Sequence, residues 1–223
     1  MDTLVVDIGG ISVKLHASGQ ASDSFPTPPG MTPPQLMQAV ADLTADWRYE
    51  RVSIGYPGPV RHDRPVREPV NLGTGWVAFD FQAAFGCPVH MLNDAAMQAL
   101  GSYRDGVMLF LGLGTGLGTA LIHDGHIVPL EMAHLPFRDG ETFERLLGKA
   151  GMDRLGTARW KEYVVEAIGL FSYVLCPDYV VLGGGNAQNF TAGELPDHVS
   201  LGHNSDAFTG GLRMWDDRGP AQE

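Results

Sequence analysis

Two glycine-rich segments, half a chain apart, carry the clearest chemical signal in this sequence. Residues 4–15 and residues 108–122 each predict an apolar strand, a glycine turn and a second strand. A turn of this kind directs backbone N–H groups toward one place, and such a concavity binds phosphate with little help from side chains. Two turns at matching positions therefore predict a phosphate group held between two related halves of the chain. A purely structural turn is the alternative for the second.

The residues around the turns argue against the best-known glycine motifs. No G-x-x-x-x-G-K-[ST] sequence occurs, which argues against a P-loop. A dinucleotide-binding turn opens a helix, whereas the turn at 112–118 is followed by residues 119–125, which predict a strand and a hairpin. A protein-kinase glycine loop also lies between strands, but its His-Arg-Asp and Asp-Phe-Gly partners are absent from the sequence.

The chemistry of these turns depends on the elements that hold them in place. In the first half, the expected elements are a β-hairpin of residues 4–8 and 12–17, a proline-rich loop over 22–34, a helix from 34 to about 47, a buried strand 52–56, a long loop over 61–75, a short helix 77–84, a strand 89–92 and a helix 95–103. In the second half, they are strands 107–113, 119–123 and 126–128, helices 141–149 and 158–174, a strand 179–182 and a closing helix 206–215. Hydrophobic periodicity and turn residues support these elements.

The same plan thus occurs twice along the chain. Three strands followed by helices and strands, in both halves, predict an α/β protein with two lobes and a cleft between them. We expect an N-terminal lobe of residues 1–104 and a C-terminal lobe of residues 105–223, with the C-terminal helix free to pack back on the N-terminal lobe. A chain of 223 residues is long enough to give each lobe a core.

Composition and charge restrict the function classes further. Hydrophobic content of 44% and charged content of 18% are ordinary for a globular protein, and the net charge of −11 argues against a general nucleic-acid binder. No apolar stretch approaches the roughly 18–20 residues of a membrane span, and the first residues lack the basic region of a secretory signal. Cys87 and Cys176 stand singly, so we expect a cytoplasmic protein with no nucleic-acid or membrane partner.

Five motifs, in this order, resemble those of the ROK sugar kinases, and within that family most closely those of the polyphosphate- or ATP-dependent glucokinases. They are Asp7-Ile8-Gly9-Gly10 with Lys14, Asn93-Asp94-Ala95, the glycine run 111–118, Glu131-Met132-Ala133-His134, and Val181-Leu182-Gly183-Gly184-Gly185. Together they span most of the chain. The resemblance implies an actin-like, duplicated fold of the ribonuclease-H type, in which a sugar and a phosphoryl donor meet in the interlobe cleft.

On the sugar side, the resemblance makes Asp94 the candidate general base. Phosphorylation of a hydroxyl needs a carboxylate within hydrogen-bond reach, which accepts the proton as the new O–P bond forms. Asn93, Glu131 and His134 would bind sugar hydroxyls, and Gly58 would offer its backbone to the sugar. A helix N-cap is the alternative for Asn93 and Asp94. A solvated surface position is the alternative for Glu131 and His134.

On the donor side, Gly114, Thr115 and Gly116 would hold the transferred phosphoryl group through backbone N–H groups and the threonine hydroxyl. The further donor-side candidates are Gly9, Gly10, Ser12, Lys14, Gly183, Gly184 and Gly185. Asp7 ends an apolar strand, where an unpartnered carboxylate is costly, so it is a candidate ligand of Mg²⁺ through water, or a turn cap. The wet face of a strand is the alternative for Lys14, and a structural hinge for the triple glycine. The expected cofactor is Mg²⁺, with ATP or polyphosphate as co-substrate.

The sequence departs from the family pattern at several positions. Ile11 stands where the family has Ser or Thr, and the loss of one neutral hydrogen bond to phosphate is worth about 0.5–1.5 kcal/mol. Ala133 replaces a glycine, which restricts the backbone if φ is positive there. No cysteine lies near His134, so we predict no structural zinc. The family's further sugar-binding glutamate has two candidates, Glu141 and Glu144.

Two weaker candidates and one charged segment complete the expected site. Asn71 and Trp76 are loosely expected to line the sugar pocket. Residues 138–161 hold six basic and four acidic side chains, a relatively basic strip on an acidic protein. This strip would follow a polyanionic donor such as polyphosphate, or it is a solvated helix face with paired charges. The chain also leaves little room for a full adenine-binding insert.

The sequence therefore predicts a hexose kinase that transfers a phosphoryl group from polyphosphate or ATP to the 6-hydroxyl of glucose or a related sugar. The resemblance also implies a homodimer. A ROK-type sugar-binding sensor with weakened or lost transfer is the alternative, which Ile11 and Ala133 favour. Another actin-like kinase, for acetate or pantothenate, is a third hypothesis, against which Glu131 and His134 argue.

Overall fold

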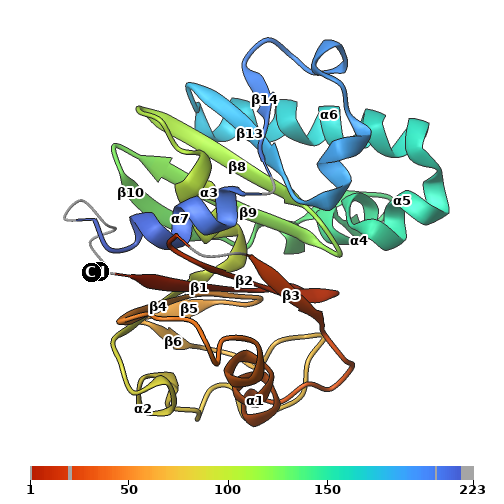
Figure 1. Ribbon diagram of the computed structural model, residues 1–223. Helices are drawn as coiled ribbons and strands as arrows, with labels where there is room; N and C mark the ends of the chain where they lie inside the picture. The colour runs from red at the N-terminus through yellow and green to blue at the C-terminus, as the bar shows by residue number, and fades with distance from the viewer. Residues whose placement is uncertain (1, 20–21, 204, 217–223) are drawn as a thin grey trace.

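Two five-stranded sheets, one from each half of the chain, form the framework of the protein (Figure 1). The structure is a computed structural model that describes residues 2–19, 22–203 and 205–216. The first sheet consists of β1 (Thr3–Ile8), β2 (Ser12–Ala17), β3 (Asp23–Pro26), β4 (Arg51–Tyr56) and β7 (Val89–Asn93). The second consists of β8 (Val107–Leu113), β9 (Leu117–His123), β10 (His126–Leu130), β13 (Tyr179–Gly183) and β14 (Val199–Leu201).

The remaining elements are short hairpins and helices. The hairpins are β5 (Val60–Arg61) with β6 (Arg64–Pro65), and β11 (Pro136–Arg138) with β12 (Glu141–Thr142). The helices are α1 (Pro33–Leu43), α2 (Phe81–Phe85), α3 (Asp94–Ser102), α4 (Phe143–Leu147), α5 (Lys149–Leu155), α6 (Thr157–Leu175) and α7 (Asp206–Arg213), and the 3₁₀ turns are η1 (Met132–His134), η2 (Gly185–Asn189) and η3 (Ala192–Glu194). No helix in the described part of the chain is long and apolar enough to cross a membrane.

The two sheets have the same topology, which confirms the expected duplication. Their strand orders are β3-β2-β1-β4-β7 and β10-β9-β8-β13-β14. In each sheet the first three strands pair antiparallel and the last three pair parallel. The turn between β1 and β2 therefore corresponds to the turn between β8 and β9. These are the two glycine turns of the sequence.

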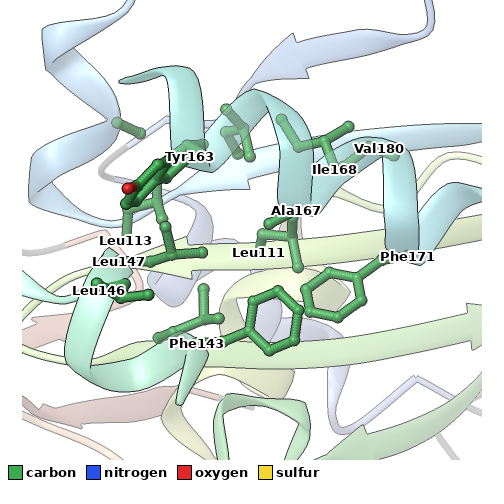
Figure 2. Close-up of a cluster of buried hydrophobic side chains, with 14 of the residues drawn as sticks. Leu111, Leu113, Phe143, Leu146, Leu147, Tyr163, Ala167, Ile168, Phe171 and Val180 are labelled. Carbon is green, nitrogen blue, oxygen red and sulfur yellow. The ribbon is translucent and has the colours of Figure 1, made fainter. Parts of the chain in front are cut away.

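Side chains of the central strands point alternately to the two faces of each sheet. Each lobe therefore has an outer core on one face of its sheet and shares an inner core on the other face. In β1, Leu4, Val6 and Ile8 pack with α1, whereas Val5 packs with α3 and α7. In β8, the odd-numbered leucines pack under α6. Figure 2 shows this outer core of the second half, where Phe143 lies against Phe171 with ring centroids 4.6 Å apart. Because side chains alternate between the faces of a strand, Asp7 falls on the inner face with Val5.

Helices α3 and α7 lie between the two sheets and pack against each other (Figure 1). A Cβ atom at Gly101 would collide with the carbonyl oxygen of Asp206, and one at Gly210 with that of Met97. These glycines let the two backbones touch. The α7 segment also reaches the first sheet, where the Ser53 hydroxyl donates to the carbonyl of Gly211 (2.5 Å). We propose the lobe boundary at residues 104 and 105, in the connection between α3 and β8.

Several predicted elements differ from those observed. The proline-rich loop over 22–34 contains the edge strand β3, and the expected helix over 141–149 is divided into α4 and α5 at Gly148. The predicted helix 77–84 begins only at Phe81, because the Asp80 carboxylate accepts from the backbone N–H of Ala83 (3.0 Å) and caps the helix there. Strand β14 was not predicted.

Candidate active site

The two glycine turns meet between the lobes. A Cβ atom placed on Gly10 would lie 3.2 Å from the hydroxyl oxygen of Thr115, so no side chain separates the first turn from the second. The structure thus brings together the two halves of the predicted phosphate clamp. A Cβ atom at Gly10 would require the threonine hydroxyl to move by a few tenths of an ångström.

The second turn is held from behind through its carbonyl groups. The carbonyl of Gly114 accepts from the Asn186 side chain (2.8 Å) and from the backbone N–H of Lys149 (3.2 Å), which also donates to the carbonyl of Thr115 (3.1 Å). The N–H of Gly114 closes the turn on the carbonyl of Gly116 (3.0 Å). Within the described residues, the N–H groups of Thr115 and Gly116 have no acceptor. These two donors are available to an anion.

Glu144 anchors this turn. In the sequence it was one of two candidates, with Glu141, for a further sugar-binding glutamate. Its carboxylate accepts from the N–H of Leu117 (3.1 Å). It lies directly against Gly116, where a Cβ atom would be 2.5 and 2.8 Å from its two oxygens. Glu141, the other candidate, forms ion pairs with Arg145 (3.3 Å) and Arg154 (2.8 Å). Of these two candidates, Glu144 is therefore the one whose carboxylate touches the second glycine turn.

The first turn is closed by backbone and by a hydroxyl from a distant loop. The N–H of Gly9 donates to the carbonyl of Ser12 (3.0 Å), and the Thr27 hydroxyl donates to the carbonyl of Gly9 (2.9 Å). Ser12 thus takes part through its backbone. The Ile11 side chain is 77% exposed at the tip. Thr27 was missed because nothing local in the sequence connects it to a turn 18 residues away.

Asp7 and Lys14 are direct neighbours across the β1–β2 ladder. The Lys14 ammonium lies 3.9 Å from the carboxylate of Asp7, which is 4% exposed. Burial raises the pKa of Asp7, and the Lys14 charge opposes this. Lys14 therefore does not simply occupy the wet face of the strand.

Asp94 opens helix α3, and Asn93 provides the helix cap. The Asn93 side-chain oxygen accepts from the N–H groups of Ala95 (3.0 Å) and Ala96 (3.2 Å). Asp94 uses one carboxylate oxygen to accept from Ala95 (2.8 Å). The amide of Asn93 donates to the carbonyl of Gly58 (3.2 Å), which places the Gly58 turn beside this junction.

The surroundings of Asp94 make it a weak acid. Burial raises the pKa of its carboxyl group from 3.8 to about 7, with a further contribution from the charge of Asp7 and a smaller one from Glu131. Two backbone hydrogen bonds oppose the shift. A carboxylate with a pKa near neutrality is suited to accept a proton from a reacting hydroxyl and release it again. Asp7 and Glu131 thus lie close enough to Asp94 for their charges to act on its carboxyl group.

Glu131 and His134 form an exposed pair at η1. The His134 ring nitrogen Nε2 lies 3.4 Å from the Glu131 carboxylate, and the two side chains are 67% and 54% exposed. The Thr119 hydroxyl holds the segment by donating to the carbonyl of Leu130 (2.7 Å). Ala133 is buried and does not have a positive φ, so the alanine introduces no backbone strain. The condition under which Ala133 would restrict the backbone is therefore not met.

The triple glycine lies against the second glycine turn. Gly184 has φ +79°, and a Cβ atom there would be 2.5 Å from the carbonyl oxygen of Leu113. Gly183 packs on the ring of Phe110 without room for a side chain. Asn186, which follows directly, reaches the carbonyl of Gly114 (2.8 Å). The segment thus borders the predicted phosphate site, and Asn186 is a further residue of the site that the sequence did not single out.

The expectation that Trp76 lines the sugar pocket is wrong. Its side chain is fully buried in the core of the first lobe, with ring centroids 5.9 Å from Tyr56 and 6.2 Å from Phe81. Tyr56 in turn lies under Gly58, where a Cβ atom would be 2.9 Å from its ring. Trp76 therefore supports the Gly58 turn from behind. Asn71 lies exposed on the surface loop.

The basic strip over 138–161 is a surface of matched charges. All six of its cations have a carboxylate partner; the pairs are Arg138–Glu166, Arg145–Glu141, Lys149–Asp153, Arg154–Glu141, Arg159–Glu162 and Lys161–Glu194. A polyanion would have to displace these carboxylates. The structure therefore favours the interpretation as a paired helix face over a track for polyphosphate.

The carboxylates of this site could hold a metal ion only together with water and the phosphates of a bound substrate. Within the described residues, no three His, Cys, Asp or Glu side chains are close enough to hold a metal ion by themselves. Asp7 provides one buried carboxylate beside Asp94. Mg²⁺ is commonly bound by one or two carboxylates, water and substrate phosphates, and Asp7 fits that pattern.

Comparison with known proteins agrees with this geometry. A model of the ROK family matches residues 3–129. A curated relative, polyphosphate glucokinase of Mycobacterium tuberculosis (strain ATCC 25177 / H37Ra), is 27% identical over 203 residues, covering 81% of this chain and 76% of the relative.

Solved structures show the same fold over almost the whole chain. The inorganic polyphosphate/ATP-glucomannokinase from Arthrobacter sp. strain KM aligns with a TM-score of 0.77 and 25% identity, over 94% of this chain and 96% of that one. A ROK family glucokinase from Streptomyces griseus, in complex with glucose and AMPPNP, aligns with a TM-score of 0.78 and 18% identity, over 95% and 98%. The predicted actin-like fold is confirmed.

Proposed function

This chain belongs to the ROK family, and we propose that it is a hexose kinase that transfers a phosphoryl group from polyphosphate or ATP to the 6-hydroxyl of glucose or a closely related sugar. The observation that carries this proposal is the position of Asp94. Its carboxyl group, with a pKa of about 7, is electrostatically coupled to Asp7 on the donor side and to Glu131 on the sugar side. A proton acceptor between a phosphate site and a hydroxyl-binding site is what phosphoryl transfer requires.

In the proposed reaction, the sugar hydroxyl oxygen attacks the terminal phosphorus of the donor. The new O–P bond forms while the bond from that phosphorus to the bridging oxygen breaks, and the donor leaves one phosphoryl group shorter. Asp94 accepts the hydroxyl proton. The free N–H groups of Thr115 and Gly116 donate to the phosphoryl oxygens, where negative charge accumulates in the transition state.

The sugar would be oriented by the residues around Asp94. Asn93 retains hydrogen-bonding capacity beyond its cap and its bond to Gly58. Glu131 and His134 are exposed and paired, so their polar atoms are free to accept from and donate to vicinal hydroxyls. The comparison with glucokinases supports glucose or a related hexose as the substrate.

Asp7 would hold Mg²⁺ through water, next to the donor phosphates. When bound, the ion neutralises phosphate charge during transfer. Lys14, 3.9 Å from Asp7, places a second positive charge at the same position.

A sugar-binding protein that has lost transfer is the second candidate function. The 77% exposed Ile11 favours it, because the first turn lacks a hydroxyl for the donor. Ala133 does not favour it, since the alanine is unstrained. A homodimer in the cytoplasm is also part of the proposal; light scattering of the purified chain would test the dimer.

A coupled assay for glucose 6-phosphate, with ATP and polyphosphate supplied separately, tests the proposed function. We expect turnover with at least one donor. Absence of turnover with both, while glucose still raises the melting temperature, would refute the kinase and leave the sugar-binding protein. The Asp94→Asn variant serves as the negative control, because it should bind glucose without turnover.

A further inference from the structure

Helix α3, which begins with the proposed base, rests on the second sheet through a contact between very small residues. Ala95 follows Asp94 directly and is 4% exposed. A Cβ atom placed on Gly118 of β9 would lie 2.5 Å from the Cβ atom of Ala95. Gly112 of β8 is directly opposite Gly118 in the strand pair, and a Cβ atom there would lie 3.9 Å from the same methyl group. We call Gly112 and Gly118 the glycine pair.

Close approach, and not backbone conformation, is the reason for glycine at these two positions. Neither residue of the glycine pair has a positive φ. Both belong to regular strands that pair with each other. An L-residue could therefore adopt the backbone conformation at Gly118, but its side chain would collide with α3. The glycine pair thus lets the helix approach the strands as closely as an alanine methyl group permits.

This contact lies between the proposed base and the proposed phosphate site. The backbone N–H of Ala95 donates to the carboxylate of Asp94 (2.8 Å), so Ala95 holds the base directly. On the other side of the contact, Gly118 is two residues from Gly116, whose N–H group is one of the two donors available to an anion. A short and nearly rigid connection therefore joins the carboxylate to the anion-binding turn.

The contact of α3 with the first sheet has a different character. A Cβ atom on Gly55 of β4 would collide with the terminal methyl group of Met97 and would lie 3.2 Å from the carboxylate of Asp7. Methionine is flexible and adapts to its surroundings, whereas the Ala95 methyl group has no other rotamer to adopt. The first lobe can therefore shift slightly against α3, while the helix keeps its distance from the second turn.

We propose that the contact of Ala95 with the glycine pair sets the distance between the Asp94 carboxylate and the phosphoryl group at the second turn. Ala95 and Gly118 are thus positioning residues of the transfer reaction, which act through Asp94 and the turn without touching the reacting atoms. This inference rests on the proposed kinase function. It also assigns the base to the second lobe in its movements, although β7 of the first sheet leads into α3.

The test adds the missing methyl group. In Gly118→Ala, the two methyl groups need about 1 Å more room to reach an ordinary carbon–carbon contact of roughly 3.5–4.0 Å. A displacement of about 1 Å lowers the rate of a positioned reaction about 100-fold. We expect kcat for glucose 6-phosphate formation to fall by about this factor. The KM values for glucose and for the donor should change less than about threefold, because the contact touches neither substrate.

A matched control separates positioning from packing. A Cβ atom on Gly211 of α7 would collide with the Val5 side chain, in the same inner core. Gly118→Ala and Gly211→Ala are both overpacked and should both lower the urea midpoint. The control should keep kcat within about threefold when assayed well below its urea midpoint, since a change in stability alone does not alter the turnover of the folded protein.

A compensating variant tests whether the distance itself matters. Gly118→Ala combined with Ala95→Gly moves the methyl group from the helix to the strand and restores the room between them. We expect this double variant to recover kcat at least about tenfold over Gly118→Ala alone. A defect confined to the glycine turn would not be relieved by a change in α3. Met97→Leu, which conserves volume on the flexible side, should keep kcat within about fivefold.

The outcomes separate this inference from the proposed function. Absence of wild-type turnover with both donors would refute the kinase and, with it, this inference. Wild-type turnover would leave the kinase standing and overturn the inference in three cases. These are an unchanged kcat in Gly118→Ala, an equal loss in Gly211→Ala or Met97→Leu, and no recovery in the double variant.

Discussion

Replacement of Asp94 by asparagine probes both the electrostatics and the chemistry of the proposed site. Burial, together with the charge of Asp7, raises the pKa of Asp94 from 3.8 to about 7. Asparagine keeps an oxygen that can accept the hydrogen bond from the backbone of Ala95, but it carries no charge to desolvate. The variant therefore removes an electrostatic cost and the proposed base together.

The direction of the stability change follows from proton binding. Between pH 3.8 and about 7, the folded chain holds a proton on Asp94 that the unfolded chain has released, so stability falls as pH rises through this window. Above this pH window, the raised pKa of Asp94 lowers the free energy of unfolding by at most about 4 kcal/mol. We expect Asp94→Asn to be more stable than the wild type at pH 8, and this advantage to shrink by about 1.4 kcal/mol at pH 6.

Urea unfolding at pH 6, 7 and 8 measures this difference while avoiding the isoelectric point near 5.0. Asp80→Asn is the matched control, since Asp80 also starts a helix but is exposed. In the glucose 6-phosphate assay, kcat should fall at least 100-fold in Asp94→Asn, as expected for loss of a general base. The wild-type kcat/KM should rise through pH 7 as Asp94 ionises. A variant within tenfold of wild-type activity, or a stability difference independent of pH, would refute the reasoning.

Substitutions at three further positions test the turns. Glu144→Ala should raise the KM for the donor at least tenfold, because it leaves the N–H of Leu117 without its acceptor. Glu144→Gln keeps an acceptor and should raise this KM less. Equal KM values for the two variants would contradict the anchoring role of Glu144. Gly184→Ala should lower the free energy of unfolding by about 1–3 kcal/mol, because φ is +79° and a Cβ atom would meet the Leu113 carbonyl; an unchanged urea midpoint would count against this. Ile11→Thr should lower the donor KM about twofold to tenfold by adding one hydrogen bond to phosphate, and an unaltered KM would show that the hydroxyl does not reach the donor.

Features with local signals were predicted well. The hairpin around Gly9 and Gly10, the strand-to-helix junction at Asp94 and the strands around the second glycine turn all follow from alternation, glycine and capping residues within a few positions. The edge strands β3 and β14 have only four and three residues, and β3 includes Asp23 and Pro26. Each of them is a strand because it pairs with its neighbour in the sheet, and its own few residues carry no pattern that would predict a strand.

Side-chain environment was the least predictable property. Trp76 stands in a polar loop in the sequence, yet it is fully buried because the loop folds back over Tyr56 and Phe81. The strip over 138–161 has an excess of cations, but its arginines and lysines are paired with acids up to 33 residues away.

The amino-acid sequence by itself determined the duplicated plan and the two glycine turns, because both depend on residue type and short spacing. The resemblance of its motifs to those of the ROK family added the candidate residues Asp94, Glu131 and His134. Only the tertiary structure decided that the turns touch at Gly10 and Thr115. It also decided that Asp94 is a weak acid, since burial and the charge of Asp7 act through space. A pKa, an ion pair and a contact between turns depend on distances between segments that chain order does not specify.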